Sequence, residues 1–267
     1  MRKLLKADLH MHSAEDDYDV IVPSAREVID RAVRFGFDVI AITNHMAMCY
    51  SDELKDYAKK RNVLLVPGAE VEAGGRHILV LNPTEEAVKA RTFDELREAK
   101  VRADRIMAVV APHPFFPSKS SVGKLVIDHV DVFDALEHCA FYFRGLNYNR
   151  LTKRMARRLW LPLVANSDAH YSWQFGRTYS LLRAHKTIEG VIEAVKRGDL
   201  EIVSSPLPWN KITIRLGLRG LRIPEYLLWK EWREGDSYWD SDVHQRKTAY
   251  WSEYEKGFIK HSGLEFG

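Results

Sequence analysis

The chain has 267 residues, of which 46% are hydrophobic and 29% are charged, a size and balance that fit one main domain with a large buried core. The 40 basic and 37 acidic residues leave a formal net charge of +3, so charge alone gives no argument for a nucleic-acid or membrane partner. Two cysteines argue against a disulfide framework, and no apolar run reaches the length of a membrane span. We therefore expect a soluble, cytoplasmic protein without a membrane partner.

Short apolar runs alternate with amphipathic segments from the start of the chain to about position 200. The first run predicts a strand at 4–10, and a helix follows that Pro23 and Ser24 begin and Gly36 ends. Further strands are predicted at 38–43, 63–72, 77–81, 107–112, 132–137, 161–167 and 178–182, and further helices at 51–61, 92–105, 147–160 and 187–198. This alternation indicates parallel βαβ units, and seven or eight strands fit a closed barrel better than an open sheet.

The pattern changes after about Ser204. Five of the seven tryptophans follow this point, among many charged residues and without a βαβ rhythm. We expect a barrel domain at 1–203 and an aromatic-rich C-terminal extension at 204–267 that packs on the barrel and buries its aromatic faces. A contact between subunits of an oligomer and a wall of the substrate site are the alternatives for this extension.

Side chains with metal-binding or acid–base chemistry stand at the ends of the predicted strands. His10 and His12 close the first strand, His45 closes the second, and Glu70 closes the third. Five more such residues open, close or directly follow a strand: His77, His113, Glu137, Asp168 and His170. Because the carboxyl ends of parallel barrel strands meet at one face, where barrel active sites lie, we expect most of these side chains to converge.

The two histidines of the first strand, His10 and His12, can point to the same side, because alternate strand residues do so. That pair alone is equally consistent with hydrogen-bonded histidines at a barrel rim. Many imidazoles and carboxylates buried together are costly unless cations hold them, so the repetition predicts a metal cluster. Ligands without thiolate suit manganese, zinc or iron, and their number predicts two or three divalent ions. Hydrolysis is the reaction to which such a centre is best suited.

The ordered motifs DLHMHS, AITNH, PGAEVE, HILVL, APHP, DALE and NSDAH resemble the polymerase and histidinol phosphatase (PHP) superfamily over residues 5–200. The resemblance implies an α/β fold, a distorted (β/α)7 TIM-like barrel, with a two- or three-metal site that hydrolyses phosphoesters. It implies three ligand groups: His10, His12, Glu70 and Asp168; Glu70, His77 and His113; and Asp17, His45 and His170. Asp17 is indicated by the resemblance only, because other acids share its loop.

Two segments depart from the family pattern. Asn44 stands in the second motif where the family commonly has Asp, and the acidic run AEDDYD replaces a more usual Ser-Asp-Gly turn. Glu137 matches a family motif and is interpreted as a residue that supports the ligands or contacts substrate. Phosphate also attracts basic side chains, and the candidates in loops expected at the catalytic face are Lys119, Arg144 and Arg177.

The leading hypothesis is a metal-dependent phosphatase acting on a small phosphorylated metabolite or nucleotide, with a metal-bound hydroxide held by the ligands as the attacking group. The second candidate is a PHP-type nuclease or exonuclease on DNA or RNA; the near-neutral charge weakens it, whereas C-terminal aromatic residues that could stack on bases favour it. The third is a metal-binding module that has lost catalysis. The complete set of candidate ligands argues against that third hypothesis.

Overall fold

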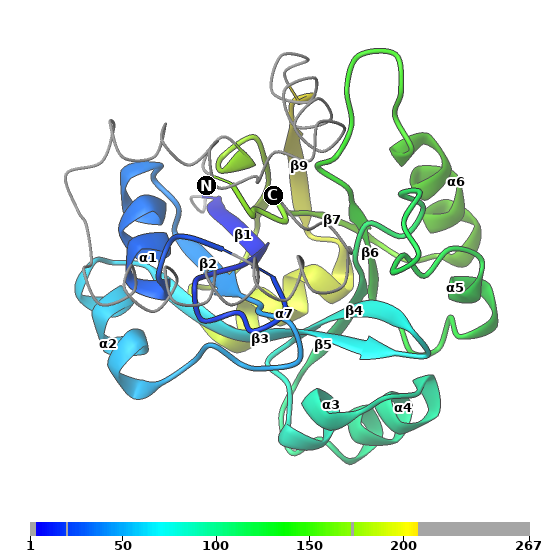
Figure 1. Cartoon of the computed structure of the whole chain (residues 1–267), viewed down its shortest axis with the longest axis horizontal. Helices are drawn as coiled ribbons and strands as arrows, with labels where there is room; N and C mark the ends of the chain where they lie inside the picture. Colours follow the sequence, from blue (N-terminus) through cyan, green and yellow to red (C-terminus); the bar gives the residue numbers. More distant parts are fainter. Residues whose placement is uncertain (1–3, 20, 172–173, 208–267) are drawn as a thin grey trace, which may run out of the picture. The chain divides into compact units, whose positions relative to one another are not determined.

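The computed structural model describes residues 4–19, 21–171 and 174–207, all of which lie in one compact unit of the chain. Nine strands form one sheet: β1 (Leu5–Met11), β2 (Val39–Ile42), β3 (Leu64–Ala73), β4 (Arg76–Leu81), β5 (Ala108–Ala111), β6 (Ala135–His138), β7 (Leu163–Ala165), β8 (Thr178–Leu182) and β9 (Leu200–Ser204). The helices of the described residues are α1 (Ala25–Arg34), α2 (Asp52–Lys60), α3 (Glu85–Lys89), α4 (Phe93–Arg102), α5 (Leu125–Asp128), α6 (Asn149–Leu159) and α7 (Ile188–Arg197) (Figure 1).

The strand order is β7-β6-β5-β4-β3-β2-β1-β8-β9, and the sheet curves into a nearly closed barrel. The predicted α/β barrel is thereby confirmed. The pairs β1–β2, β2–β3, β5–β6 and β6–β7 are parallel, as the alternation of strands and helices predicts. Two strands run against their neighbours: β4 forms a hairpin with β3 through Gly74 and Gly75, and β8 pairs antiparallel with β1 and β9. The sequence prediction lacked β9.

A β-bulge in β1 directs the two histidines of this strand. The register with β2 shifts between Asp8 and Met11. Up to Leu9, the odd-numbered residues of β1 pack in the core cluster that contains side chains of most strands together with those of α7. After the bulge, Met11 packs against α1 on the other side of the sheet. The bulge therefore changes the phase of the side-chain alternation, and bulges next to active sites commonly re-aim a side chain in this way.

The segment that follows β7 closes the barrel against β1. The backbone N–H of His12 donates to the carbonyl of Ala169 at 3.3 Å, and Met11 and Ala169 form a parallel bridge. Earlier in the same strand, the backbone N–H of Leu9 donates to Oδ1 of Asn166 at 2.9 Å. The hydroxyl of Ser180 in β8 also bonds the backbone of Ala165 in β7. Segments near positions 10 and 168 therefore lie side by side.

Helices cover the outer faces of the sheet, as Figure 1 shows. α1 and α2 cover β2 and its neighbours, and α3 to α6 cover β3 to β6. Ser24 begins α1 with a capping box to Glu27, which satisfies the first free N–H groups of the helix. No helix of the described part of the chain is long and apolar enough to cross a membrane. All of the predicted extension at 204–267 except its first four residues lies outside the described residues, so the packing of the extension on the barrel stays a prediction.

Candidate metal centre

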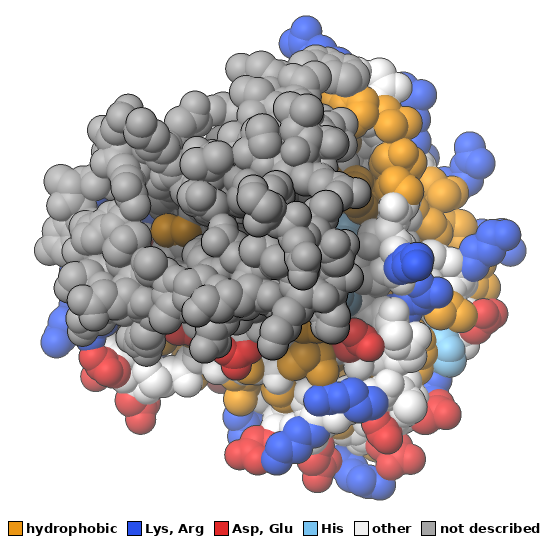
Figure 2. All heavy atoms as spheres, viewed as in Figure 1, with side chains coloured by type: hydrophobic (Ala, Val, Ile, Leu, Met, Phe, Trp, Pro, Cys, Tyr) orange, Lys and Arg blue, Asp and Glu red, His pale blue; other side chains and the backbone are white. Residues whose placement is uncertain are grey.

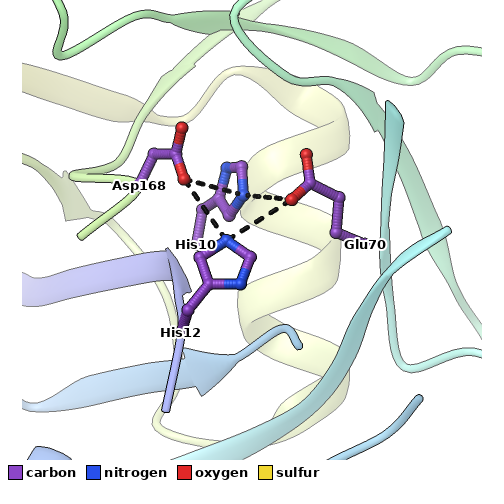
Figure 3. Close-up of side chains that lie close together, drawn as sticks. All are labelled: His10, His12, Glu70 and Asp168. Carbon is purple, nitrogen blue, oxygen red and sulfur yellow. Dashed lines mark ion pairs between the residues drawn. The ribbon is translucent and has the colours of Figure 1, made fainter. Parts of the chain in front are cut away.

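Four buried side chains form the centre of the site, and they come from segments far apart in sequence (Figure 3). His10 lies near the end of β1, His12 directly follows this strand, Glu70 lies in β3, and Asp168 lies in the segment after β7. One ligand atom of each lies within 4.8 Å of one ligand atom of every other. Nε2 of His10 is 3.3 Å from Oε2 of Glu70 and 3.4 Å from Oδ1 of Asp168, and Nε2 of His12 is 3.4 and 3.3 Å from the same two oxygens.

This arrangement fits a divalent cation. The Nε2 atoms of His10 and His12 and Oδ1 of Asp168 are buried and lack a hydrogen-bond partner. Leaving such atoms unpaired away from water is costly, and their convergence on one place provides the nitrogen and oxygen ligands that zinc, manganese and iron accept. The chemistry of the donors and their lack of other partners therefore agree on a metal.

Glu70 lies between two groups of histidines. Its Oε2 faces His10, His12 and, at 3.1 Å, Nε2 of His45. Its Oε1 is 3.1 Å from Nδ1 of His77 and 3.4 Å from Nε2 of His113. The residues predicted from the strand ends are thus brought together around one carboxylate whose two oxygens have different partners.

His170 lies at the outer side of this cluster. Its Nδ1 is 3.4 Å from Oδ1 of Asp168, and its ring stacks at a tilt on His12 with centroids 4.4 Å apart. Asp168 and His113 both adopt left-handed backbone conformations, with φ of 46° and 32°. Non-glycine residues seldom adopt this conformation, and strained backbone clusters at active sites, which agrees with a constrained geometry of these two residues.

Glu137 supports the cluster from behind. Its Oε1 accepts from Nδ1 of His10 at 3.0 Å and from Nδ2 of Asn166 at 2.8 Å, and its Oε2 accepts from the backbone N–H of His113 at 2.9 Å. A carboxylate that accepts from Nδ1 fixes the imidazole tautomer and leaves the Nε2 lone pair toward the metal position. This geometry agrees with the interpretation of Glu137 as a supporting residue.

The acid that reaches the cluster from the first loop is Asp16. Its Oδ2 accepts from Nδ1 of His12 and Nδ1 of His45, both at 2.9 Å, and from the backbone N–H of His45 at 3.0 Å. Asp17, the residue that the resemblance implied, is exposed and belongs to none of the metal-type groups of the described residues. The structure thus brings Asp16 to the cluster and leaves Asp17 outside.

Besides Asp16, the sequence reasoning missed two further residues of the same loop. Asp19 Oδ2 lies 3.1 Å from Nε2 of His170. The ring of Tyr18, which is 59% exposed, stacks on His45 with centroids 4.9 Å apart and an interplanar angle of 26°. The acidic run AEDDYD indicated that an acid of this loop contacts the cluster. Which of its acids points toward the histidines depends on the backbone conformation of the loop.

The charges of the cluster stabilise one another. Burial alone would lower the pKa of His10, but Asp168, Glu137 and Glu70 outweigh it and hold this pKa well above its usual value. Burial acts against the ionised form of Glu70 too, yet His10 and His113 hold its pKa well below the usual range. The carboxylates of the cluster therefore favour positive charge next to them, which protonated histidines supply when no cation is bound.

His45 shows the same balance. Burial lowers its pKa, but hydrogen bonds to Asp16 and Glu70 raise it to about 9. Although burial opposes the ionised form of Asp16, His12 and His45 hold its pKa far below the usual value. Asn44, the residue that departs from the family pattern, does not join this network and instead bonds Ser13 through Oδ1 and Nδ2 at 2.9 and 3.0 Å.

The three predicted phosphate-binding cations come from three different loops. Lys119 and Arg144 are exposed in loops, and Arg177 is half-buried just before β8. Their role toward phosphate stays a prediction.

Comparisons with known proteins agree with this fold. Residues 147–200 match the model of a PHP-associated family. The uncharacterized protein MJ1587 of Methanocaldococcus jannaschii is 26% identical over 166 residues, which cover 58% of this chain and 95% of that protein. A DNA polymerase III of the PolC type from Clostridium perfringens is 31% identical over 65 residues, 24% of this chain and 4% of the polymerase.

Three solved structures share the fold. PsfC from Pseudomonas syringae has a TM-score of 0.57 at 18% identity, covering 76% of this chain and 93% of its own. A protein assigned as a metal-dependent phosphoesterase from Bifidobacterium adolescentis has a TM-score of 0.52 at 16% identity, and the match covers 72% of this chain and 96% of that protein. Endonuclease Q, in complex with a duplex substrate with an abasic lesion, has a TM-score of 0.54 at 18% identity, and the match covers 76% of this chain and 60% of that protein.

A histidine–carboxylate cluster at the strand ends of a distorted α/β barrel defines a metal-dependent hydrolase of the barrel class. Residues 147–200 match a PHP-associated family model, in agreement with the motifs that resemble the PHP superfamily, and PHP-domain relatives are metal-dependent phosphoesterases or nucleases. The resemblance seen in the sequence is thereby confirmed, together with the prediction of a metal-dependent phosphoesterase.

Proposed function

We propose that the protein hydrolyses a phosphoester at the cluster around Glu70, with at least two divalent ions. The observation that carries the proposal is the division of Glu70, whose Oε2 faces His10, His12 and His45 while its Oε1 faces His77 and His113. A carboxylate placed in this way can bridge two ions. Manganese, zinc and iron all suit these ligands.

The side chains have separable roles in this proposal. His10, His12, Glu70 and Asp168 would hold one ion, and Glu70 with His77 and His113 would hold a second. Divalent ions at these positions supply an activated water and charge for the phosphoryl oxygens. Glu137 fixes the ring of His10 through Nδ1, and Asp16 fixes those of His12 and His45. These contacts keep the Nε2 atoms aimed inward before any ion arrives.

For the substrate class, the sequence analysis left two hypotheses. A small phosphorylated metabolite or nucleotide is the first, and Lys119, Arg144 and Arg177 are its candidate phosphate contacts. A nucleic acid is the second. The fold comparisons include one protein assigned as a phosphoesterase and one endonuclease, so they support phosphoester chemistry without deciding between the two.

The test of the activity compares the full chain with a His10→Ala, His12→Ala double variant. Metal content after manganese loading and turnover of bis-p-nitrophenyl phosphate and p-nitrophenyl phosphate are the measurements. We expect the double variant to lose the bound metal and all detectable turnover, and His185→Ala, outside the cluster, to keep both. Stoichiometric metal without turnover of any phosphoester in the unchanged protein would favour the inactive metal-binding module instead.

A further inference from the structure

Helix α6 carries five basic side chains and no acidic one in its 11 residues. All five are exposed: Arg150, Lys153, Arg154, Arg157 and Arg158. The near-neutral charge of the whole chain conceals this local excess. Figure 2 shows blue Lys and Arg side chains along the edge of the molecule where Figure 1 places α6.

No ion pair joins these five side chains to an acid among the described residues. Arginines elsewhere on the surface behave differently, because most of them contact a carboxylate. The pairs are Arg26 with Glu53, Arg61 with Asp30, Arg97 with Asp94 and Asp131, Arg102 with Glu98, Arg105 with Asp104, Arg183 with Glu201, and Arg197 with Glu193. The basic face of α6 thus presents charge that no acid in the described part of the chain neutralises.

The basic residues occupy one side of the helix. They recur at spacings of three and four, and such residues are neighbours on a helix surface. The opposite side is buried, with Met155 and Ala156 packed in the core under β6. The apolar side is therefore not available to a membrane, which an interfacial helix needs to enter the lipid.

The helix begins at the rim of the barrel that holds the metal cluster. Asn149, its first residue, donates through Nδ2 to the carbonyl of Cys139 at 2.9 Å and accepts the N–H of Cys139 through Oδ1 at 2.8 Å. Cys139 follows Glu137 by two residues, and Glu137 contacts His10. Arg144 is exposed in the loop between β6 and α6. The basic face thus starts next to the catalytic end of β6.

We propose that this basic face binds the phosphate backbone of a nucleic acid and that the ester cleaved at the metal cluster is a phosphodiester of that strand. A helix of 11 residues is about 16 Å long, which spans roughly five phosphates at about 3.4 Å per nucleotide. Several exposed cations in a row, without an ion-pair partner among residues 4–19, 21–171 and 174–207, match a polyanion, whereas one small phosphate needs a concave site. The inference rests on the proposed phosphoester hydrolysis and names its substrate class.

Binding is tested with the full chain in EDTA, so that cleavage cannot interfere. Fluorescence anisotropy of 5′-labelled single-stranded and duplex DNA and of RNA is followed from low to moderate salt. The test variant is Arg150→Gln, Arg154→Gln, Arg157→Gln, Arg158→Gln. The matched control, Arg102→Gln, Arg105→Gln, Arg183→Gln, Arg197→Gln, removes the same number of exposed arginines, all of them paired with acids.

We expect the α6 variant to lose affinity by about 10- to 100-fold at low salt and to show a flatter salt dependence, by roughly 3 in the slope of log K against log salt concentration. The control keeps most of the affinity. Lysine at the same four positions of α6 should restore binding, which separates charge from folding. An equal loss in both glutamine variants, or tighter binding to phosphatidylserine vesicles than to every oligonucleotide, would overturn the proposal.

Turnover of bis-p-nitrophenyl phosphate separates this inference from the proposed function. We expect the manganese-loaded α6 variant to hydrolyse this small diester like the unchanged protein while losing cleavage of the oligonucleotide. If the unchanged protein hydrolyses no phosphoester, the proposed function fails, and the anisotropy measurement still decides whether α6 binds nucleic acid. Phosphomonoester turnover with no oligonucleotide binding would confirm the cluster's activity and reject the role of α6.

Discussion

At the scale of single residues, two neighbouring acids of the first loop have the same chemistry and opposite environments. The turn of the loop puts Asp16 against Nδ1 of His12 at 2.9 Å and leaves Asp17 exposed to solvent. Only Asp16 can therefore hold the rings of the cluster in place.

This difference gives a direct test at two adjacent positions. Asp16→Asn removes the charge that accepts from the rings of His12 and His45, so we expect metal affinity and turnover to fall by about 10- to 100-fold or more. Asp17→Asn makes the same chemical change in an exposed side chain and should leave both within twofold. Titration of the metal-free variants with manganese measures the affinities. The reverse ranking would restore the assignment that the resemblance implied.

His138 is a second residue whose environment has a measurable consequence. It is 4% exposed, its ring nitrogens lack hydrogen-bond partners, and Tyr142 packs edge-on against it. Burial, with a smaller contribution from Lys153 and opposed by Glu137, lowers its pKa to about 4. The unfolded chain binds this proton near pH 6.5 and the folded chain only near pH 4, so stability is full above pH 6.5 and falls as the pH drops toward 4.

The free energy of unfolding should therefore depend on pH through His138. Relative to His138→Phe, which cannot titrate, the unchanged protein should lose about 2 kcal/mol between pH 7 and pH 5. Urea denaturation at both pH values measures this loss, and comparison with the variant removes the contribution of the metal cluster. Parallel pH profiles for the two proteins would show that the ring is protonated in the folded state.

At the scale of elements, helix starts and strand positions followed from the sequence better than strand direction did. The strand ends also led to His10 and His45, because residues at the carboxyl ends of parallel strands meet at one face. Ser24 and Thr92 cap their helices with capping boxes, as their spacing to an acid three residues later indicates. The alternation of strands and helices predicted parallel pairing, yet β4 returns antiparallel to β3. The adjacent Gly74 and Gly75 are a hairpin signal that explains this turn, since both have positive φ.

Two helices end with a left-handed residue, and they offer a matched comparison. Trp160 ends α6 with φ of 56° and is 93% exposed, whereas Gly198 ends α7 with φ of 68°. The left-handed conformation costs a non-glycine residue about 1–2 kcal/mol, and glycine costs roughly 0.5–1 kcal/mol through the freedom of the unfolded chain. We therefore expect Trp160→Gly to raise the free energy of unfolding by about 0.5–1 kcal/mol.

Gly198→Ala should act in the opposite direction. An added Cβ would lie 2.8 Å from Cβ of Pro162 in addition to the unfavourable φ, so a loss of about 1–3 kcal/mol is expected. Urea denaturation in the presence of metal measures both variants. A loss of stability in Trp160→Gly would instead show that the indole makes a stabilising contact despite its exposure.

At the scale of the whole molecule, barrel closure depends on contacts that no local pattern contains. The bond from Leu9 to Asn166 joins residues 157 positions apart, and the pairing of Met11 with Ala169 lies beside it. The barrel class followed from the number and alternation of strands. The bulge in β1 and the closing segment after β7, which bring His12 and Asp168 together, required the fold itself.

Because the proposed metal ligands come from both ends of the barrel sequence, metal binding should stabilise the whole fold. An ion at 100 times its dissociation constant contributes about 2.7 kcal/mol, which for a domain of this size raises Tm by roughly 5–10 °C. Differential scanning calorimetry with manganese and with EDTA measures this shift. We expect no shift in the His10→Ala, His12→Ala variant, and an equal shift in that variant would place the stabilising ion elsewhere.

The shift in Tm should also grow with pH. The pKa of His45 is raised to about 9, so its proton stabilises the metal-free fold fully below pH 6.5, and that stability is lost as the pH rises toward 9. The same proton competes with a metal for the ring, so metal affinity rises over this range. Both effects widen the difference between the metal-loaded and metal-free protein from pH 6.5 to pH 8. Calorimetry at these two pH values measures it, and an unchanged difference would mean that the histidines of the cluster hold no protons when the metal is absent.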